Sequence, residues 1–131
     1  MNNQPADRMR MAREAEQLAA EYLITKGYAI KERNWRPKPA PYEIDIIAQK
    51  GDVMAFVEVK ARSTADPTSA VESVDYKKQR FISRAADIYL RQQPHLYYYR
   101  FDIIAVTTKD SAQRITHIED AFMPPLGGVR K

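Results

Sequence analysis

Two charged side chains in one apolar run are the residues of this sequence that could most readily do chemistry. Glu58 and Lys60 stand in Val53 to Ala61, a valine-rich run that predicts a β-strand. Because successive side chains of a strand face opposite sides, Glu58 and Lys60 share a face. Burying a carboxylate or an ammonium costs several kcal/mol unless the group is paired or binds a metal. A divalent cation together with a phosphodiester would stabilise both.

A second carboxylate, Asp45, is brought to the same face by an expected hairpin. Residues 43–49 form another β-rich run, and residues 50–52 (Lys-Gly-Asp) supply turn chemistry. A turn centred on Gly51 and Asp52 pairs residues whose numbers sum to about 103, which sets Asp45 opposite Glu58. Two carboxylates at ~5 Å repel each other unless a cation lies between them.

The same spacings also fit a purely structural arrangement. The register that pairs Asp45 with Glu58 sets Glu43 opposite Lys60, which would give a ladder of ordinary ion pairs on a solvated face. Spacing alone does not choose between a metal site and an ion-pair ladder.

Composition limits the class of protein. The chain has 131 residues, of which 44% are hydrophobic and 29% charged, as expected for one globular domain. The absence of cysteine excludes disulfides, thiol nucleophiles and zinc–thiolate sites. No apolar run approaches the ~20 residues of a membrane span, and the N-terminus lacks a secretory signal pattern. We therefore expect a cytoplasmic protein with no membrane partner.

The net charge of +4 and the pI near 9.3 permit nucleic acid as a partner. Each basic cluster, taken singly, also fits a solvated surface. The clusters are Arg8, Arg10 and Arg13; Arg33, Arg36 and Lys38; and Lys77, Lys78, Arg80 and Arg84.

The order of elements predicts one α/β domain with a mixed central β-sheet flanked by helices. A helix that connects two strands of one sheet favours a parallel pair. The domain is expected over residues 7–122, with flexible termini at 1–6 and 123–131. Helices are expected at 7–26, capped by Asp7 and ended by Gly27, and at 74–92; strands are expected at 28–35, 43–49, 53–61, 97–107 and 114–118.

The first helix carries an apolar stripe with a glutamate on each border. Periodicity does not choose between Glu14 and Glu16, since both fall about 100° from the middle of the stripe. The stripe consists of Met11, Ala15, Leu18, Ala19, Tyr22 and Leu23, and that of the second helix consists of Val74, Phe81, Ile82, Ala85, Ile88 and Tyr89.

Five ordered motifs carry a resemblance to a known family. The chain resembles the PD-(D/E)xK nuclease superfamily and, within it, a widespread family of small bacterial proteins related to archaeal Holliday-junction resolvases. The resemblance runs from about Arg13 to Phe122 and implies a restriction-endonuclease-like fold. Its motifs are residues 15–20 (AEQLAA), 33–36 (RNWR), 43–48 (EIDIIA), 56–62 (FVEVKAR) and 100–104 (RFDII).

The resemblance implies roles for individual residues. Asp45 and Glu58 would ligate Mg²⁺ or Mn²⁺ together with the backbone carbonyl of Val59. Lys60 would orient or help deprotonate the attacking water and stabilise charge on the phosphate. Glu16 would complete the site from the first helix. A solvated helix border remains the alternative for Glu16.

Taken together, these motifs predict a metal-dependent DNA endonuclease, with branched DNA among its candidate substrates. Arg33, Arg36, Lys38 and Lys78 are the predicted phosphate contacts. A nuclease-like fold that binds nucleic acid without cutting it, or a protein-interaction module, are the alternatives. The sequence leaves homodimer formation open.

A few further residues carry expectations of their own. The family usually has glycine where this chain has Ala15 and Tyr42, and Tyr42 lies in a proline-rich loop that bears on substrate access. Asp102 alternates with apolar residues and is expected to be a buried, hydrogen-bonded aspartate. His95 and His117 lack a metal-ligand spacing and are expected on the surface.

Overall fold

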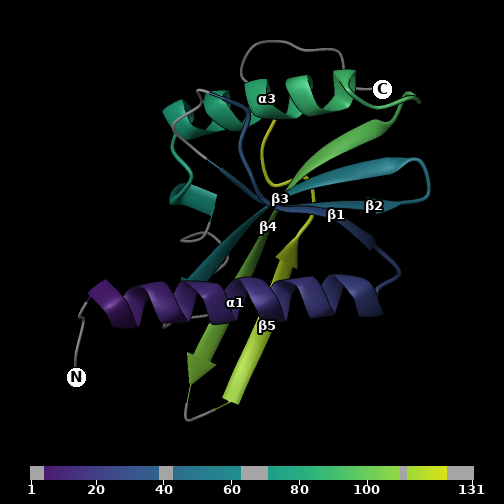
Figure 1. The fold of residues 1–131 in the computed structure, drawn as a ribbon. Helices are drawn as coiled ribbons and strands as arrows, with labels where there is room; N and C mark the ends of the chain where they lie inside the picture. The colour runs from purple at the N-terminus through teal and green to yellow at the C-terminus, as the bar shows by residue number, and fades with distance from the viewer. Residues whose placement is uncertain (1–4, 39–42, 63–70, 110–111, 124–131) are drawn as a thin grey trace.

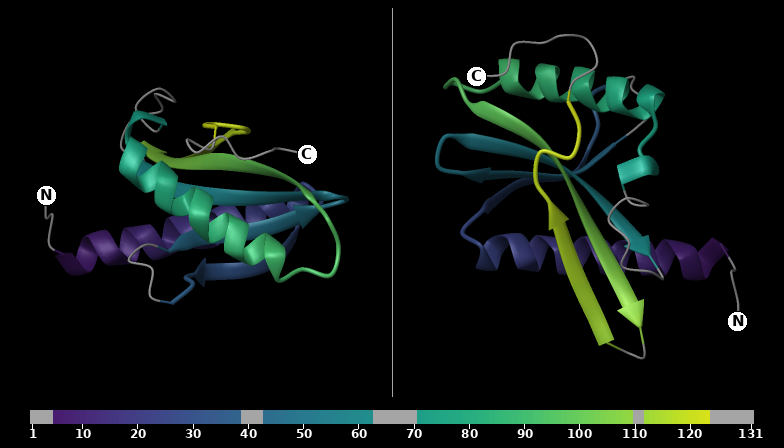
Figure 2. Two further views of the ribbon diagram at one scale, coloured as in Figure 1. Left: turned by 90° about the horizontal axis from the view of Figure 1, so that it is seen from above. Right: turned by 180° about the vertical axis from the view of Figure 1, so that it is seen from behind.

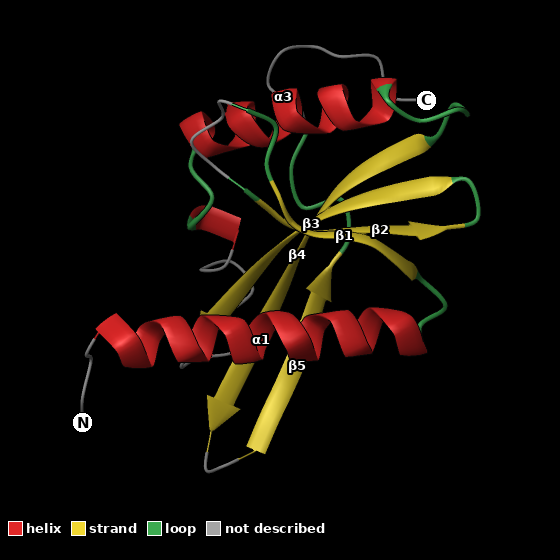
Figure 3. Ribbon diagram, in the orientation of Figure 1, coloured by secondary structure: helices red, strands yellow, loops and turns green. Residues whose placement is uncertain are grey.

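The computed structural model describes residues 5–38, 43–62, 71–109 and 112–123 (Figure 1). The main elements follow in the order helix, three strands, helix, two strands, as the sequence predicts. Figure 3 colours them by type. The elements are α1 (Pro5–Thr25), β1 (Ala29–Trp35), β2 (Ile44–Lys50), β3 (Val53–Arg62), α3 (Tyr76–Arg91), β4 (Tyr98–Lys109) and β5 (Ala112–Ile118).

The five strands form one mixed sheet in the order β1-β2-β3-β4-β5. The neighbours β3 and β4 are parallel, while the other three pairs are antiparallel. Parallel neighbours cannot be joined by a tight turn, and α3 supplies the crossover between them. The predicted single α/β domain with a mixed sheet is confirmed.

The two helices cover opposite faces of this sheet, as the two views of Figure 2 show. On one face, Ala19 and Leu23 of α1 pack against Ile46, Val57 and Ile104. Each large apolar side chain buried in this way contributes roughly 1.5–3 kcal/mol. Because successive side chains of a strand face opposite sides, β2 and β3 contribute to both the core beneath α1 and the core beneath α3.

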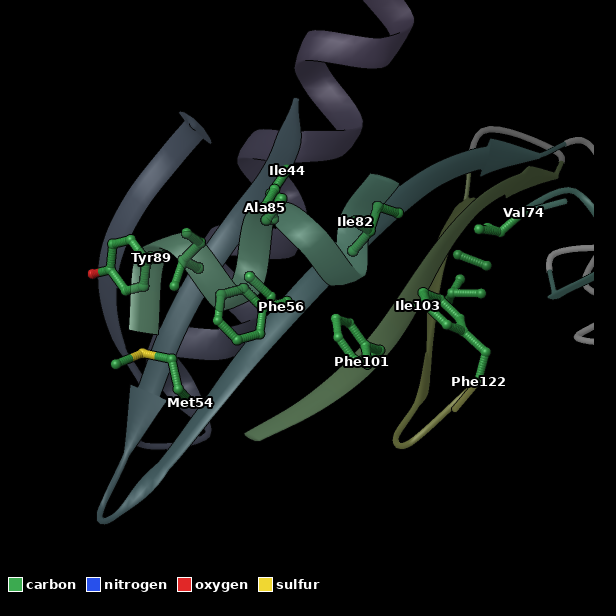
Figure 4. Close-up of a cluster of buried hydrophobic side chains, with 13 residues drawn as sticks. Ile44, Met54, Phe56, Val74, Ile82, Ala85, Tyr89, Phe101, Ile103 and Phe122 are labelled. Carbon is green, nitrogen blue, oxygen red and sulfur yellow. The ribbon is translucent and has the colours of Figure 1, made fainter. Parts of the chain in front are cut away.

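The opposite core is richer in aromatic rings (Figure 4). Ile82, Ala85 and Tyr89 of α3 pack here against Phe56 and Phe101 of the sheet. The ring of Phe56 meets that of Tyr89 edge-on, with 6.1 Å between centroids. This core holds α3 firmly over the central strands, which matters because α3 also reaches the candidate site.

The β2–β3 hairpin has the predicted register. Ile46 pairs with Val57 and Lys50 with Val53, so the pair numbers sum to 103. Gly51 adopts a φ of 61° in the two-residue turn, a conformation that glycine takes without strain.

Some predicted details differ from the structure. Asp7 does not cap α1, which begins at Pro5 and holds Asp7 within its first turn. The N-cap of α3 is Asp75, whose side chain accepts a hydrogen bond from the Lys78 N–H. Met11 and Ile88 are 52% and 41% exposed, because periodicity marks a stripe without showing how far the sheet extends beneath it. In the described part of the chain, no helix is long and apolar enough to cross a membrane.

Candidate active site at the end of the β2–β3 hairpin

The site begins where the paired region of the hairpin ends. Ile46 and Val57 form the last pair of the ladder and face the α1 core. Asp45 and Glu58 come one residue further on, and Glu58 turns toward the opposite face, where it meets Lys78 of α3. The backbone N–H of Val59 donates a hydrogen bond to Asp45 Oδ2 at 2.8 Å. The hairpin thus brings the two carboxylates close enough for the Glu58 charge to raise the pKa of Asp45. The alternation of β2 breaks at Asp45, since Ile44 packs in the α3 core and Ile46 in the α1 core.

Glu58 is the centre of the cluster and is only 2% exposed. Its Oε2 lies 2.7 Å from the Nζ of Lys78 and 3.7 Å from the Nζ of Lys60. Its other oxygen, Oε1, is buried and has no hydrogen-bond partner. Since leaving a buried acceptor unsatisfied costs about 1–3 kcal/mol, Oε1 is a candidate ligand atom.

The electrostatics of Asp45 point the same way. Burial, the Glu58 carboxylate and, to a lesser extent, Glu16 raise the pKa of Asp45 to about 8, although the Val59 N–H opposes this shift. Without a cation the fold therefore favours the neutral form of Asp45 near neutral pH. A divalent ion would reverse the balance by stabilising the charged form.

The two lysines have different protonation preferences. Burial lowers the pKa of Lys60, and the neighbouring Lys78 ammonium lowers it further, against the opposing effect of Glu58. Burial alone would also lower the pKa of Lys78, but its hydrogen bond and charge interaction with Glu58 raise that pKa overall. Lys78 is thus the fixed cation of the cluster. Lys60 is the lysine that can more readily give up a proton.

The donor set fits a hard divalent cation. Mg²⁺ and Mn²⁺ prefer oxygen ligands and are often held by one or two carboxylates plus water and phosphate oxygens. Asp45 and Glu58, with the backbone carbonyl of Val59, are donors of this kind, and Glu58 has an unsatisfied oxygen. Across the described ranges, no three His, Asp or Glu side chains gather into an all-protein metal cage.

Glu16 lies near the cluster of Asp45, Glu58, Lys60 and Lys78, and its charge acts on Asp45. Its Oε1 accepts a hydrogen bond of 3.0 Å from Asn34 on β1, and its charge is close enough to raise the pKa of Asp45. The preceding Ala15 is 3% exposed and packs in the α1 core, so the small side chain there serves helix packing.

The cross-strand ion-pair ladder that would join Glu43 to Lys60 does not form. Glu43 is exposed and precedes β2, which begins at Ile44. Within the described part of the chain, the ion-pair partner of Lys60 is Glu58 on its own strand. The predicted pairing of Glu43 with Lys60 is therefore wrong, because the ladder ends before it reaches Glu43.

The predicted phosphate contacts separate into two groups. Arg33, Arg36 and Lys38 are exposed on β1 and just after it, and Arg33 Nη1 donates to Gln17 Oε1 at 2.8 Å. Lys78 instead turns inward to Glu58. The expected influence of Tyr42 falls outside the described residues.

Sequence reasoning missed the position of Lys78 in the site, although a signal was present. Lys78, Ile82, Ala85 and Tyr89 follow one another at spacings of four, three and four residues, so Lys78 continues the buried stripe of α3. A lysine at the end of a buried stripe must find a carboxylate, and Glu58 is that carboxylate.

A second polar cluster lies on the α1 side of the sheet. Asp102 is fully buried and accepts hydrogen bonds from the side chain of Arg100 and from the Asp120 N–H, as expected for a structural aspartate. His117 Nε2 lies 2.8 Å from Asp102 Oδ2, and its other ring nitrogen lies 3.2 Å from the Tyr22 hydroxyl. The prediction of a surface His117 is wrong, because strand pairing with β4 turns it into this cluster; His95 is exposed as predicted.

Comparison with known proteins shows which family the chain belongs to. A sequence model of the uncharacterised protein family UPF0102 matches residues 15–106, which include the whole hairpin site. A UPF0102 protein of Parabacteroides distasonis is 44% identical over 115 residues, covering 88% of this chain and 93% of the relative. Another from Chlorobium chlorochromatii is 41% identical over 126 residues, covering 92% and 96%. The chain belongs to the UPF0102 family.

Proposed function

We propose that this protein is a metal-dependent DNA endonuclease, with branched DNA among its candidate substrates. The observation that carries the proposal is Glu58, whose carboxylate is buried, adjacent to Asp45, approached by two lysines and left with one unsatisfied oxygen. A structural ion pair would satisfy both oxygens. A site that awaits a cation and a phosphate would leave one oxygen without a partner.

The residues divide the chemical work as follows. Asp45, Glu58 and the Val59 carbonyl would hold Mg²⁺ or Mn²⁺, which when bound supplies Lewis-acid stabilisation of the charge on the phosphate. Lys60, whose pKa is lowered by burial, would orient the attacking water and accept its proton or stabilise the growing negative charge. Lys78 would keep Glu58 in place and add positive charge beside the phosphate.

Phosphate contacts outside the site would hold the DNA. Arg33, Arg36 and Lys38 are exposed and follow one another on and just after β1, which neighbours the β2 strand that carries Asp45. Glu16 would act on Asp45 at a distance, through its charge.

One observation favours a second reading, a nuclease-like fold that binds DNA without cutting it. Lys78 already neutralises Glu58 at 2.7 Å, as a permanent internal cation could do in a site without metal. This reading predicts DNA binding that does not depend on divalent ions and no cleavage with any of them.

The test is incubation of the purified protein with linear, flapped and four-way DNA substrates. Mg²⁺ or Mn²⁺ should permit cleavage and a chelator should abolish it. Glu58→Gln protein, prepared in parallel, controls for a contaminating nuclease and should not cut. If the wild type cuts none of these substrates with either ion, the endonuclease proposal fails and the non-cutting binder replaces it.

A further inference from the structure

The net positive charge of the chain resides on one helix. Five basic side chains and one acidic side chain give α3 a net charge of +4, which equals the net charge of the whole chain. The one acidic residue, Asp87, is paired with Arg91 at 2.9 Å. The remaining residues of the protein balance to zero, so α3 is the source of its net positive charge.

Three of these cations lie on one flank of α3, away from the core. Lys77, Arg80 and Arg84 recur at spacings of three and four residues, and with Phe81 they line a surface groove of about 150 Å³. Among the described residues, no carboxylate lies within 4.0 Å of any of the three cations. The Nε of Arg80 is buried and has no hydrogen-bond partner. We call Lys77, Arg80 and Arg84 the α3 basic stripe.

This placement of charge works against the stability of the helix itself. Like charges three or four residues apart repel one another along a helix. Acidic residues stabilise the first turn of a helix, yet the first turn of α3 has none and begins with two lysines. A solvated helix face normally mixes the two signs. The stripe therefore has the character of a surface that meets an anion.

The stripe adjoins the candidate site. Lys78, the residue after Lys77, turns inward to Glu58, whereas Lys77 itself is exposed. From Lys77 to Arg84 the helix rises about 10 Å, which matches about three phosphate steps along one DNA strand. The stripe and the Glu58 cluster therefore meet at the first turn of α3, where Lys77 belongs to one and Lys78 to the other.

We propose that the α3 basic stripe is a binding surface for the phosphate backbone of duplex DNA next to the bond that is cut. The proposal rests on the proposed function, since it takes DNA as the substrate, and it assigns binding to residues outside the catalytic cluster. Lys77, Arg80 and Arg84 contact phosphates of one DNA strand, and Phe81 lines the groove with them.

The test measures DNA binding in chelator, where no cleavage occurs. Fluorescence anisotropy with a labelled duplex, repeated over a series of salt concentrations, compares the wild type with Lys77→Gln/Arg80→Gln/Arg84→Gln. Glutamine keeps helix propensity. The control, Arg13→Gln/Lys31→Gln/Arg114→Gln, removes the same charge from exposed positions on α1, β1 and β5. Circular dichroism and the melting temperature establish that each variant is folded.

The stripe variant should bind at least about tenfold more weakly at low salt. Its salt slope should be smaller by roughly 2.7, because each of the three cations that neutralises a phosphate adds about 0.9 to the slope. The control should stay within about twofold of the wild type, because its scattered charges neutralise no phosphate. If the triple variant does not fold, the single variants Lys77→Gln and Arg84→Gln, at exposed positions, should each lower the slope by about 0.9.

Two outcomes overturn the inference. Equal decreases in affinity for the stripe variant and the control would show that net charge alone governs binding. A wild type that binds no duplex at low salt would remove the DNA surface altogether. A wild type that binds through the stripe but cuts no DNA would instead overturn the endonuclease proposal and leave the stripe in place.

Discussion

At the scale of single residues, the two oxygens of the buried Glu58 carboxylate have different surroundings. One oxygen is held by Lys78 at 2.7 Å, while the other is buried without a partner. Lys78 thus compensates part of the Glu58 charge, while Oε1 is left without a partner. Asp45 lies beside Glu58, and its raised pKa favours the neutral carboxyl near neutral pH.

Lys60→Ala should abolish most of the proposed metal-dependent DNA cleavage while leaving DNA affinity within a few-fold of the wild type. Charge stabilisation of this kind is worth roughly 3 kcal/mol, or about a hundredfold or more in rate. Single-turnover cleavage and anisotropy measure the two quantities. Lys31→Ala, at an exposed position on β1, is the matched control, and circular dichroism checks the fold. A folded Lys60→Ala protein that cuts at the wild-type rate would remove Lys60 from the mechanism.

Asp45→Asn should raise the stability of the metal-free protein more at high pH than at low pH. The pKa of Asp45 is raised from 3.8 to about 8 in the fold. The folded state thus binds the proton more tightly than the unfolded state does, and the stability so gained is lost as pH rises through the folded pKa. Asparagine mimics the protonated acid at every pH.

Thermal unfolding of both proteins in chelator, at pH 5 and pH 9, measures this difference. The melting temperature of Asp45→Asn, relative to the wild type, should rise by several degrees between the two conditions. A difference that does not change with pH would mean that Asp45 is already charged in the metal-free protein.

At the scale of elements, the sheet separates two polar clusters by the alternation of its strands. β3 turns Glu58 and Lys60 toward α3, whereas β4 turns Asp102 toward α1. The Asp102 cluster is saturated with hydrogen bonds from Arg100, from His117 and from the backbone of Asp120. It therefore ties β4 to β5 and the residues after it, while the Glu58 cluster keeps an unsatisfied atom.

Asp102→Asn should destabilise the fold by about 3 kcal/mol, because it leaves Arg100 and His117 without their buried acceptor charge. Denaturant unfolding at pH 7 measures the destabilisation. Burial alone would raise the pKa of Asp102, but its bonds to His117 and Arg100 lower it overall. The stabilisation from Asp102 is thus fully present above the pKa that this carboxyl has in the unfolded chain. It is lost as pH falls through the lower pKa of Asp102 in the folded protein.

Asp87→Asn is the control for this substitution. Asp87 also forms an ion pair with an arginine, Arg91, but its side chain is 60% exposed. Exposed pairs contribute about 0–1 kcal/mol, so this variant should be destabilised by at most that amount. Equal destabilisation of Asp87→Asn and Asp102→Asn would contradict a structural role for the buried cluster.

At the scale of the whole molecule, the two cores leave the polar end of the hairpin between the sheet and the first turn of α3. Docking of α3 through Ile82, Ala85 and Tyr89 brings Lys78 to Glu58. Folding therefore assembles the site, and a cation bound there should in turn stabilise the fold.

Mg²⁺ or Mn²⁺ should raise the melting temperature of the wild type in proportion to site occupancy. A ligand that binds only the folded state adds about 2.7 kcal/mol at a concentration of one hundred times its Kd. The rise should disappear in Asp45→Asn and Glu58→Gln and persist in Asp87→Asn. Differential scanning fluorimetry with and without chelator is sufficient. An equal rise in all four proteins would place the ion elsewhere.

The sequence by itself determined the hairpin and its carboxylates. Residues 50–52 specify a two-residue turn, and the register that follows from it brings Asp45 and Glu58 to the same end of the hairpin, one residue beyond the pair of Ile46 and Val57. The crossover helix likewise determined the parallel pairing of β3 with β4. These features depend on local geometry, which short stretches of sequence encode.

Only the tertiary structure decided what surrounds the two carboxylates. The burial of Glu58, the inward turn of Lys78 and the enclosure of His117 depend on how α3, α1 and β5 dock onto the sheet. Helix docking brings together residues that are distant in the chain. The apolar stripe of a helix shows which face is buried, but not which side chains it packs against. The ion-pair ladder of Glu43 and Lys60 does not form, because the ladder of β2 and β3 ends before it reaches Glu43, and Lys60 lies 3.7 Å from Glu58 instead.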